Sequence, residues 1–134
     1  MNGVISLSEK EPGPKGTFKA KIQSGFYDNP RRSSMKWWDK NPTFHLADLY
    51  YGKSKKNTGF TIGANAYIDS GFRKEENEER YRLNGSFYFK PQKNKNLKAG
   101  LSYNLQYQDM GVFVLWKNDS MGLEPQDNTI DRPR

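Results

Sequence analysis

Residues that could carry out catalysis are few in this chain, and their spacing forms no catalytic arrangement. The sequence has one histidine, His45, and no cysteine, which excludes disulfides, thiolate metal sites and cysteine nucleophiles. A lone histidine lacks the partners of a metal site or a catalytic dyad, and a strand position near an interface suits it better. No phosphate-cradling glycine loop and no Gly-x-Ser-x-Gly turn occurs. We therefore expect no enzyme, no metal and no cofactor.

A cluster of glutamates is the other group that could do chemistry. Carboxylates this close together could bind calcium or act as an acid–base pair. Basic side chains interleave with them, however, and that mixture favours a solvated loop whose charges pair with one another. The acidic residues are Glu75, Glu76, Glu78 and Glu79, and the basic ones are Arg73, Lys74 and Arg80.

The residues best suited to ligand binding stand in a charged, aromatic stretch. Tryptophan faces suit sugar rings or flat aromatic chelates, and arginine suits carboxylates and phosphates. The candidate ligand-binding residues are Arg31, Arg32, Lys36, Trp37 and Trp38, with Phe113 and Trp116 as weaker candidates of the same kind. The alternative is a loop that packs against its neighbours or lies among lipid headgroups.

Alternating apolar and polar residues predict the elements that must position these side chains. The alternation runs through residues 17–26, 60–69, 80–90 and 97–108, and less cleanly through 43–51. Successive side chains of a strand point to opposite faces, so the pattern predicts one apolar and one polar face. Runs of about ten residues suit tilted strands that cross a bilayer, whereas most soluble strands have five or six. The polar face would line a wet lumen with Lys19, Lys21, Asn65, Asp69, Arg80, Arg82, Asn104 and Gln106.

The connections between these strands differ in length in a regular way. Residues 28–42 and 70–79 predict long loops, whereas 52–57 and 91–96 predict short basic turns. Alternate connections of an antiparallel meander lie at the same end of the sheet, so the tight turns share one end and the long loops share the other. This asymmetry is typical of transmembrane barrels. The predicted fold class is all-β, an antiparallel up-and-down meander that forms an open segment of a transmembrane β-barrel.

Composition narrows the classes of protein further. Only 34% of the residues are hydrophobic, yet 14% are aromatic, which disordered chains rarely combine. No apolar run of about eighteen residues predicts a membrane helix, and the first residues lack the pattern of a signal peptide. The formal charge of +7 leaves one alternative open. That alternative is a soluble basic β-sheet module that binds polyanions.

Several segments resemble one protein family, the TonB-dependent outer-membrane receptors. Residues 2–7, Asn-Gly-Val-Ile-Ser-Leu, resemble the Asn-Gly-Val-Ile-Asn-Ile segment that ends the plug domain of these receptors. A Pro-Gly-rich spacer and a long amphipathic strand follow, as they do where plug passes into barrel. The loops and strand ends at 25–32, 35–38, 69–73 and 76–80 look like the first part of such a barrel, and 113–118 looks like a later extracellular loop.

The resemblance implies a fold, a function and a set of partners. Residues 1–15 would be the end of the plug domain and its linker, 16–110 the first five barrel strands with their loops, and 111–134 an extracellular loop or disordered tail. The chain would be a fragment of an outer-membrane receptor for active uptake of an iron chelate, a vitamin or a glycan. Its partners would be the rest of the barrel and plug, outer-membrane lipid, TonB through the plug region and an unknown nutrient, with no nucleic acid.

Overall fold

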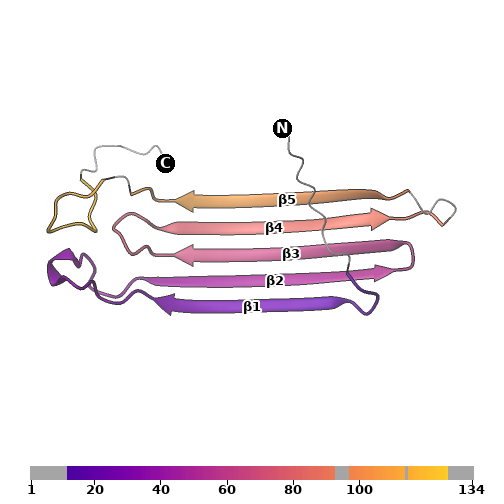
Figure 1. Cartoon of the computed structure of the whole chain (residues 1–134), viewed down its shortest axis with the longest axis horizontal. Helices are drawn as coiled ribbons and strands as arrows, with labels where there is room; N and C mark the ends of the chain where they lie inside the picture. Colours follow the sequence, from indigo (N-terminus) through magenta and orange to yellow (C-terminus); the bar gives the residue numbers. More distant parts are fainter. Residues whose placement is uncertain (1–11, 93–96, 114, 127–134) are drawn as a thin grey trace, which may run out of the picture.

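The chain folds into one antiparallel sheet whose strands follow one another in sequence order. The computed structural model describes residues 12–92, 97–113 and 115–126. Each strand pairs with the next along the chain, and β1 and β5 form the two edges (Figure 1). The predicted all-β antiparallel meander is therefore confirmed. Its elements are β1 (Thr17–Phe26), the short 3-10 helix η1 (Ser33–Met35), β2 (Thr43–Lys55), β3 (Thr58–Asp69), β4 (Glu78–Phe89) and β5 (Ala99–Met110).

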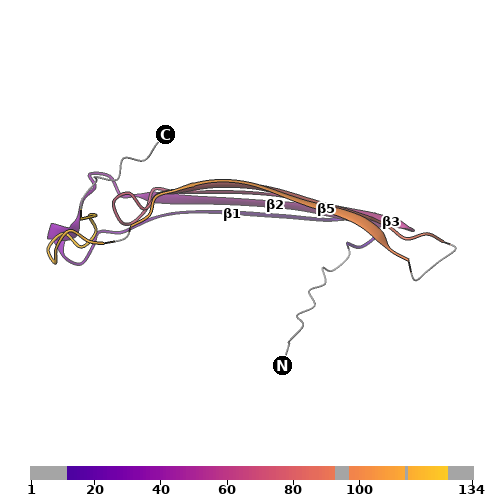
Figure 2. The same cartoon turned by 90° about the horizontal axis from the view of Figure 1, so that it is seen from above.

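The sheet is a single layer without a hydrophobic core of its own. Viewed along its plane, the strands lie in one gently arched layer, and none of the described residues forms a second layer of strands or helices over it (Figure 2). Only two hydrophobic side chains are buried among the described residues, Trp38 and Tyr88. None of the helical structure in the described part of the chain is long and apolar enough to cross a membrane.

The strand register corrects one predicted turn. Residues 52–57 were expected to form a basic turn, but β2 continues to Lys55 because residues 52–55 pair with 58–61 of β3. The turn itself contains only Lys56 and Asn57, and Lys56 has a φ of 47°. Glycine and lysine disfavour strands, which made this stretch look like a turn. A tight two-residue hairpin turn keeps the flanking residues paired, and this pairing outweighs their weak strand preference.

Two further strand limits differ from the predicted ones. β4 begins at Glu78, so Glu78 and Glu79 belong to the sheet and not to the preceding loop. β5 runs from Ala99 to Met110 and extends past the last clearly alternating residue because its register with β4 continues to Glu78. The segment at residues 2–7 that resembles the end of a plug domain and the last part of the predicted tail, 127–134, lie outside the described residues.

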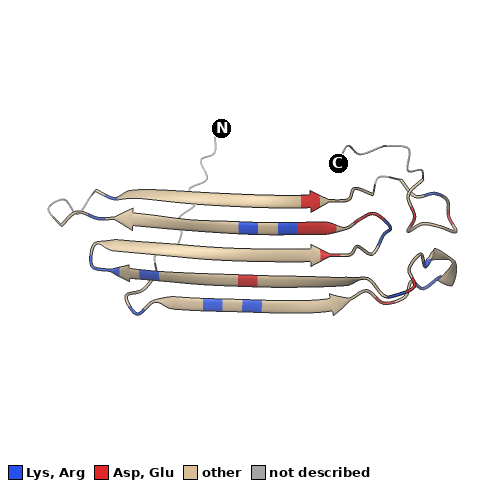
Figure 3. Cartoon of the chain, turned by 180° about the vertical axis from the view of Figure 1, so that it is seen from behind, with Lys and Arg blue, Asp and Glu red and all other residues tan. Residues whose placement is uncertain are grey.

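The two ends of the sheet differ in structure and in charge. We call the end with residues 12–16, 52–58, 89–92 and 97–99 the turn end, and the end with 27–42, 70–77 and 111–126 the loop end. Lysines gather at the turn end, and most acidic side chains lie toward the loop end (Figure 3). The loops contact one another, since the Lys74 N–H donates to the Leu123 carbonyl over 2.8 Å and the Gly111 N–H to the Asn77 carbonyl over 2.7 Å.

Candidate functional site

The apolar face of the sheet is its most unusual surface. The register places one apolar set from every strand side by side, for example Leu49 beside Ala64, Ala64 beside Leu83, and Leu83 beside Leu105. Large side chains of this set, such as Ile22 and Leu101, are 84% and 73% exposed. An exposed apolar surface of this extent marks an interaction with a membrane or with another protein.

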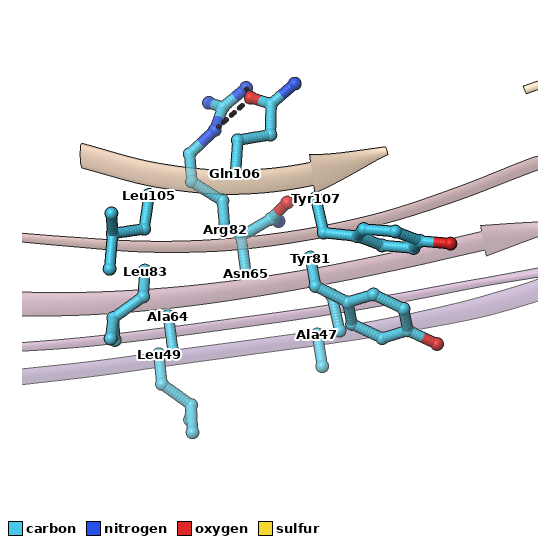
Figure 4. Close-up of a pocket in the computed structure, with 11 residues that line it drawn as sticks. Ala47, Leu49, Ala64, Asn65, Tyr81, Arg82, Leu83, Leu105, Gln106 and Tyr107 are labelled. Atoms are coloured by element: carbon cyan, nitrogen blue, oxygen red, sulfur yellow. Dashed lines mark hydrogen bonds between the residues drawn. The ribbon is translucent and has the colours of Figure 1, made fainter. Parts of the chain in front are cut away.

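A shallow hollow occupies the middle of this apolar face. It has a volume of about 580 Å³. Small side chains from β2 and β3 form its floor, and larger ones from the neighbouring positions form its walls. Figure 4 shows Leu49, Leu83 and Leu105 on one side of the strands, while Arg82 and Gln106 project to the other. The hollow is lined on the apolar face by Ala47, Leu49, Ala64, Ala66, Tyr81, Leu83, Leu105 and Tyr107.

The polar face carries a ladder of side-chain hydrogen bonds across β4 and β5. Arg82 donates from Nε and Nη2 to Gln106 Oε1 over 3.0 and 2.8 Å. Gln106 Nε2 donates to Gln108 Oε1 over 2.8 Å, and Gln108 Nε2 donates to Glu78 Oε1 over 3.1 Å. Arg80 closes the ladder with an ion pair to Glu78 at 3.0 Å. These side chains therefore bond to one another across β4 and β5, although Arg80 Nε is buried without a hydrogen-bond partner among the described residues.

Asp69 joins three segments where the polar face meets the loop end. Its Oδ2 accepts hydrogen bonds from the hydroxyls of Tyr27 and Tyr67, each over 2.7 Å, and its Oδ1 accepts from the Gly71 N–H over 2.8 Å. Partial burial raises the pKa of Tyr27 well above its usual value, and the hydrogen bond to Asp69 and the charge of its carboxylate raise it further. Tyr27 therefore remains neutral through the physiological range and acts as a donor.

Five aromatic rings pack together at the loop end, and we call them the loop-end cluster. Phe72 lies at its centre, with ring centroids 5.7 Å from Tyr27 and 5.5 Å from Trp38. Trp37 meets Trp38 edge-on at 5.6 Å and donates from its indole N–H to the Phe72 carbonyl over 3.0 Å. Phe44 completes the cluster at 5.7 Å from Tyr27. The cluster ties the 27–42 loop to the 70–77 loop.

The candidate ligand-binding residues gather at the loop end but play different roles there. Trp38 is 7% exposed, so its ring packs within the protein as the packing alternative expects. Trp37 is half-buried beside it, while Arg31, Arg32 and Lys36 are exposed. The two arginines and Met35 line a hollow of about 580 Å³. The basic groups are therefore accessible to a ligand, and Trp38 supports the loop that presents them.

Phe113 and Trp116 come from the segment after β5 and lie in the same end region. The Arg73 guanidinium lies 5.0 Å from the centroid of the Phe113 ring. Trp116 is 57% exposed and pairs through its backbone with Pro125. The 70–77 loop thus contacts the tryptophan loop on one side and the Phe113 segment on the other. Direct contact between these two groups of candidates is absent among the interactions of the described residues.

His45 and two residues of the glutamate cluster have structural partners. His45 shares a hydrogen bond with Ser24 across β1 and β2 through its Nδ1 at 2.7 Å. Glu76 lies 3.9 Å from Arg73 in an ion pair, and Glu78 pairs with Arg80. No group of three or more histidine or acidic side chains in the described ranges is placed to hold a metal ion.

Sequence reasoning missed the central positions of Phe72 and Asp69 at the loop end. Phe72 stands outside the alternating runs, so its place against the Trp38 ring depends on contacts between distant loops. The alternation places Asp69 on the polar face and does not indicate its bonds to Tyr27 and Tyr67, although the sequence does carry a signal for its bond to Gly71. Aspartate two residues before glycine favours a turn in which its carboxylate caps the glycine N–H, and Gly71 has a φ of 81°.

Comparison with known proteins gives this chain no relative. It matches no family model, no curated protein and no solved structure.

Proposed function

We propose that the chain forms part of the wall of a transmembrane β-barrel, within a TonB-dependent outer-membrane receptor that takes up an iron chelate, a vitamin or a glycan. The observation that carries the proposal is the exposed apolar face opposite a hydrogen-bonded polar face. Each Å² of apolar surface left in water costs about 25 cal/mol relative to burial. Hydrocarbon chains remove that cost on one side, while a wet lumen accommodates the other side.

Strand length supports the same proposal. β1 has 10 residues and β2 has 13, while β3, β4 and β5 have 12 each. A strand tilted across a bilayer needs about 9–11 residues, whereas the strands of soluble sheets average five or six. The sheet is therefore tall enough to cross the hydrocarbon layer with its ends in the headgroup regions.

The two edge strands of the sheet need further strands to pair with. β1 and β5 each present one side to which no described strand is paired. Unpaired backbone N–H and C=O groups cost several kcal/mol each in lipid, so spanning sheets close on themselves. Further strands of the receptor would pair with these edges and complete the barrel.

The path of the chain into β1 fits a plug that fills the lumen. Ser54 lies on the polar face, and its hydroxyl donates to the Pro12 carbonyl over 2.7 Å. The Ser54 N–H donates to the Gly13 carbonyl over 3.2 Å. The chain therefore reaches β1 along the polar face at the turn end. A plug segment, including its TonB contact, would lie on that side.

The assignment to this receptor family rests on the residue resemblances, and the loop end then supplies the ligand contacts. The plug-like segment at 2–7 lies outside the described residues, so the resemblance within the described chain rests on its loops and strand ends. The exposed Arg31 and Arg32 are suited to an anionic group of the nutrient, and Trp37, in the same loop, is only half-buried.

A pair of cysteine variants tests which face meets lipid. The chain contains no cysteine, so Leu105→Cys and Gln106→Cys each introduce a single thiol at neighbouring positions on opposite faces. After refolding into phosphatidylcholine vesicles, where the open edges of neighbouring copies can pair with one another, a charged, membrane-impermeant maleimide should label Gln106→Cys readily and Leu105→Cys at least tenfold more slowly. In denaturant both thiols should react equally, which controls for intrinsic reactivity.

Two outcomes would contradict the proposal. Equal labelling of the two thiols in vesicles would mean that lipid does not cover the apolar face. Light scattering that shows a monodisperse monomer in detergent-free buffer would mean that the chain covers this face without lipid. The soluble polyanion-binding module would then be the better interpretation.

A further inference from the structure

The apolar face changes character toward the turn end, and β2 shows this most clearly. Along one face of β2 the side chains run Ala47, Leu49, Tyr51, Lys53 and Lys55. The register places Tyr51 beside Ile62 and Lys53 beside Phe60, so both lysines continue the apolar face and not the polar one. One strand therefore passes from aliphatic through aromatic to cationic side chains.

Neither lysine has an acidic partner. Both residues are exposed, and no ion pair among the described residues includes Lys53 or Lys55. The described residues of the turn end contain no aspartate or glutamate, as the blue turns in Figure 3 illustrate. The opposite end of the same face differs, since Glu79 and Asp109 stand side by side there on β4 and β5. The positive charge is thus specific to one end of the apolar face.

The spacing of Tyr51, Lys53 and Lys55 along β2 matches the layers of a membrane surface. Tyrosine favours the boundary between hydrocarbon and headgroups. With a rise of about 3.3 Å per residue, Lys53 and Lys55 lie about 7 and 13 Å beyond Tyr51 along the strand, and less than that in depth because spanning strands tilt. Headgroup regions extend several Å beyond the hydrocarbon on each side. Lysine side chains are long enough to adjust their depth by snorkelling.

We propose that Lys53 and Lys55 bind the phosphate groups of anionic phospholipids in the leaflet at the turn end. This inference rests on the proposed membrane insertion and adds a lipid preference and an orientation to it. Each lysine near an anionic surface strengthens binding about fivefold, so the pair contributes on the order of tenfold or more. At the loop end of the apolar face, the acidic Glu79 and Asp109 disfavour contact with anionic phospholipids. The preference for anionic lipid therefore applies to the turn end alone and gives the chain one orientation in the membrane.

Flotation with two kinds of vesicle tests the pair. The full chain is refolded with vesicles of phosphatidylcholine alone, or with vesicles that also contain phosphatidylglycerol. The wild type should bind both kinds and prefer the anionic vesicles by on the order of tenfold at low salt, with the preference falling as salt rises. The double variant Lys53→Gln/Lys55→Gln should lose most of this preference and still bind neutral vesicles.

A matched control separates position from net charge. Lys19 and Lys21 are exposed on the polar face of β1, so Lys19→Gln/Lys21→Gln removes the same charge from the other side of the sheet. This control should keep the preference for anionic vesicles. Equal losses in the two double variants would overturn the proposal, as would a wild type with no preference. A Lys53/Lys55-dependent affinity for duplex DNA that exceeds the vesicle effect would also overturn it.

The same experiment separates this inference from the proposed function. Failure of the wild type to bind neutral vesicles would contradict membrane insertion. If anionic vesicles still bound it through Lys53 and Lys55, the lipid contact would stand as surface adsorption. Binding to neutral vesicles without an anionic preference would leave the proposed function intact and remove the inference.

Discussion

The two faces of this sheet share one backbone, but their exposed side chains make different contacts. On the polar face, side chains bond to one another across strands, as Arg82, Gln106 and Gln108 do. On the apolar face, large side chains such as Leu83 and Leu105 lie beside one another and remain open on the outside. The sheet therefore suits water on one face and an apolar covering on the other. Its stability depends on what covers the apolar face.

The largest expected effect comes from a charge placed at the middle of the apolar face. Leu83 lies between Ala64 and Leu105, and Asn84 is its neighbour on the polar face. Leu83→Arg should reduce the free energy of unfolding in vesicles by about 2–4 kcal/mol, the cost of arginine at the bilayer midplane. Asn84→Arg, its matched control, should change the same free energy by less than about 1 kcal/mol. Urea titration of tryptophan fluorescence in phosphatidylcholine vesicles measures both.

Equal free energies of unfolding for Leu83→Arg and Asn84→Arg would contradict the proposed difference between the two faces. A Leu83→Arg variant that kept its β-sheet circular dichroism and became more soluble in buffer would contradict that difference more strongly, because water would then be the natural solvent of both faces.

A second prediction concerns packing on the polar face. Tyr88 is the buried tyrosine of the sheet, and its ring lies over Gly59 on β3, with the ammonium groups of Lys98 and Lys90 at 4.6 and 5.4 Å from its centroid. A Cβ at Gly59 would collide with this ring. Gly59→Ala should therefore cost about 1–3 kcal/mol of stability, as overpacking does.

Gly13→Ala is the control for that substitution, because a Cβ at Gly13 meets nothing within 4 Å. It should leave the denaturation midpoint of the wild type unchanged. If both alanine variants unfolded at the wild-type midpoint, the Tyr88 ring would not be held in place, and the polar face would be as loosely packed as the apolar one.

The fold was more predictable from the sequence than the site, for a physical reason. Alternation over 60–69 and 97–108 determines which residues share a face, because side chains repeat every two residues along a strand. A shift of the strand register by one residue would exchange the two faces. The loop end depends instead on contacts between distant segments. Nothing local to Trp38 indicates that Phe72 lies against it, or that Trp37 donates to the Phe72 carbonyl. A tryptophan pair beside arginines has the same composition in a binding loop and in a packed loop.

A third, smaller prediction tests the hydrogen-bond ladder of the polar face. Gln106 accepts from Arg82 and donates to Gln108, so Gln106→Leu removes the middle of the ladder. The expected cost is about 1–2 kcal/mol, since these bonds are exposed to water. Asn104→Leu on the same face of β5 should cost less, because none of the described side chains forms a hydrogen bond with Asn104. Equal midpoints in urea would show that the ladder contributes no stability.

The smallest expected effect at neutral pH is that of Tyr27 at the loop end, because it appears only in alkali. The pKa of Tyr27 is raised in the folded protein, chiefly by partial burial and then by its hydrogen bond to Asp69 and the charge of that carboxylate. Below pH 10 the phenol is protonated in both folded and unfolded chains, so its contribution is intact. Above about pH 10 the unfolded chain loses the proton first, and stability falls by at most about 1.4 kcal/mol per pH unit until the folded pKa is passed.

Two variants separate the causes of this pH dependence. Tyr27→Phe should lessen the alkaline decline in the urea midpoint, because no phenol remains to ionise at this position, while Tyr67, which also donates to Asp69, is still present. Asp69→Asn keeps an oxygen acceptor but removes the negative charge, so Tyr27 should ionise at a lower pH, which ultraviolet absorbance of tyrosinate reports. A decline of unchanged steepness in Tyr27→Phe would place the titrating group elsewhere. The contact between Tyr27 and Asp69 would then hold the loop end by geometry alone and not by the protonation state of the phenol.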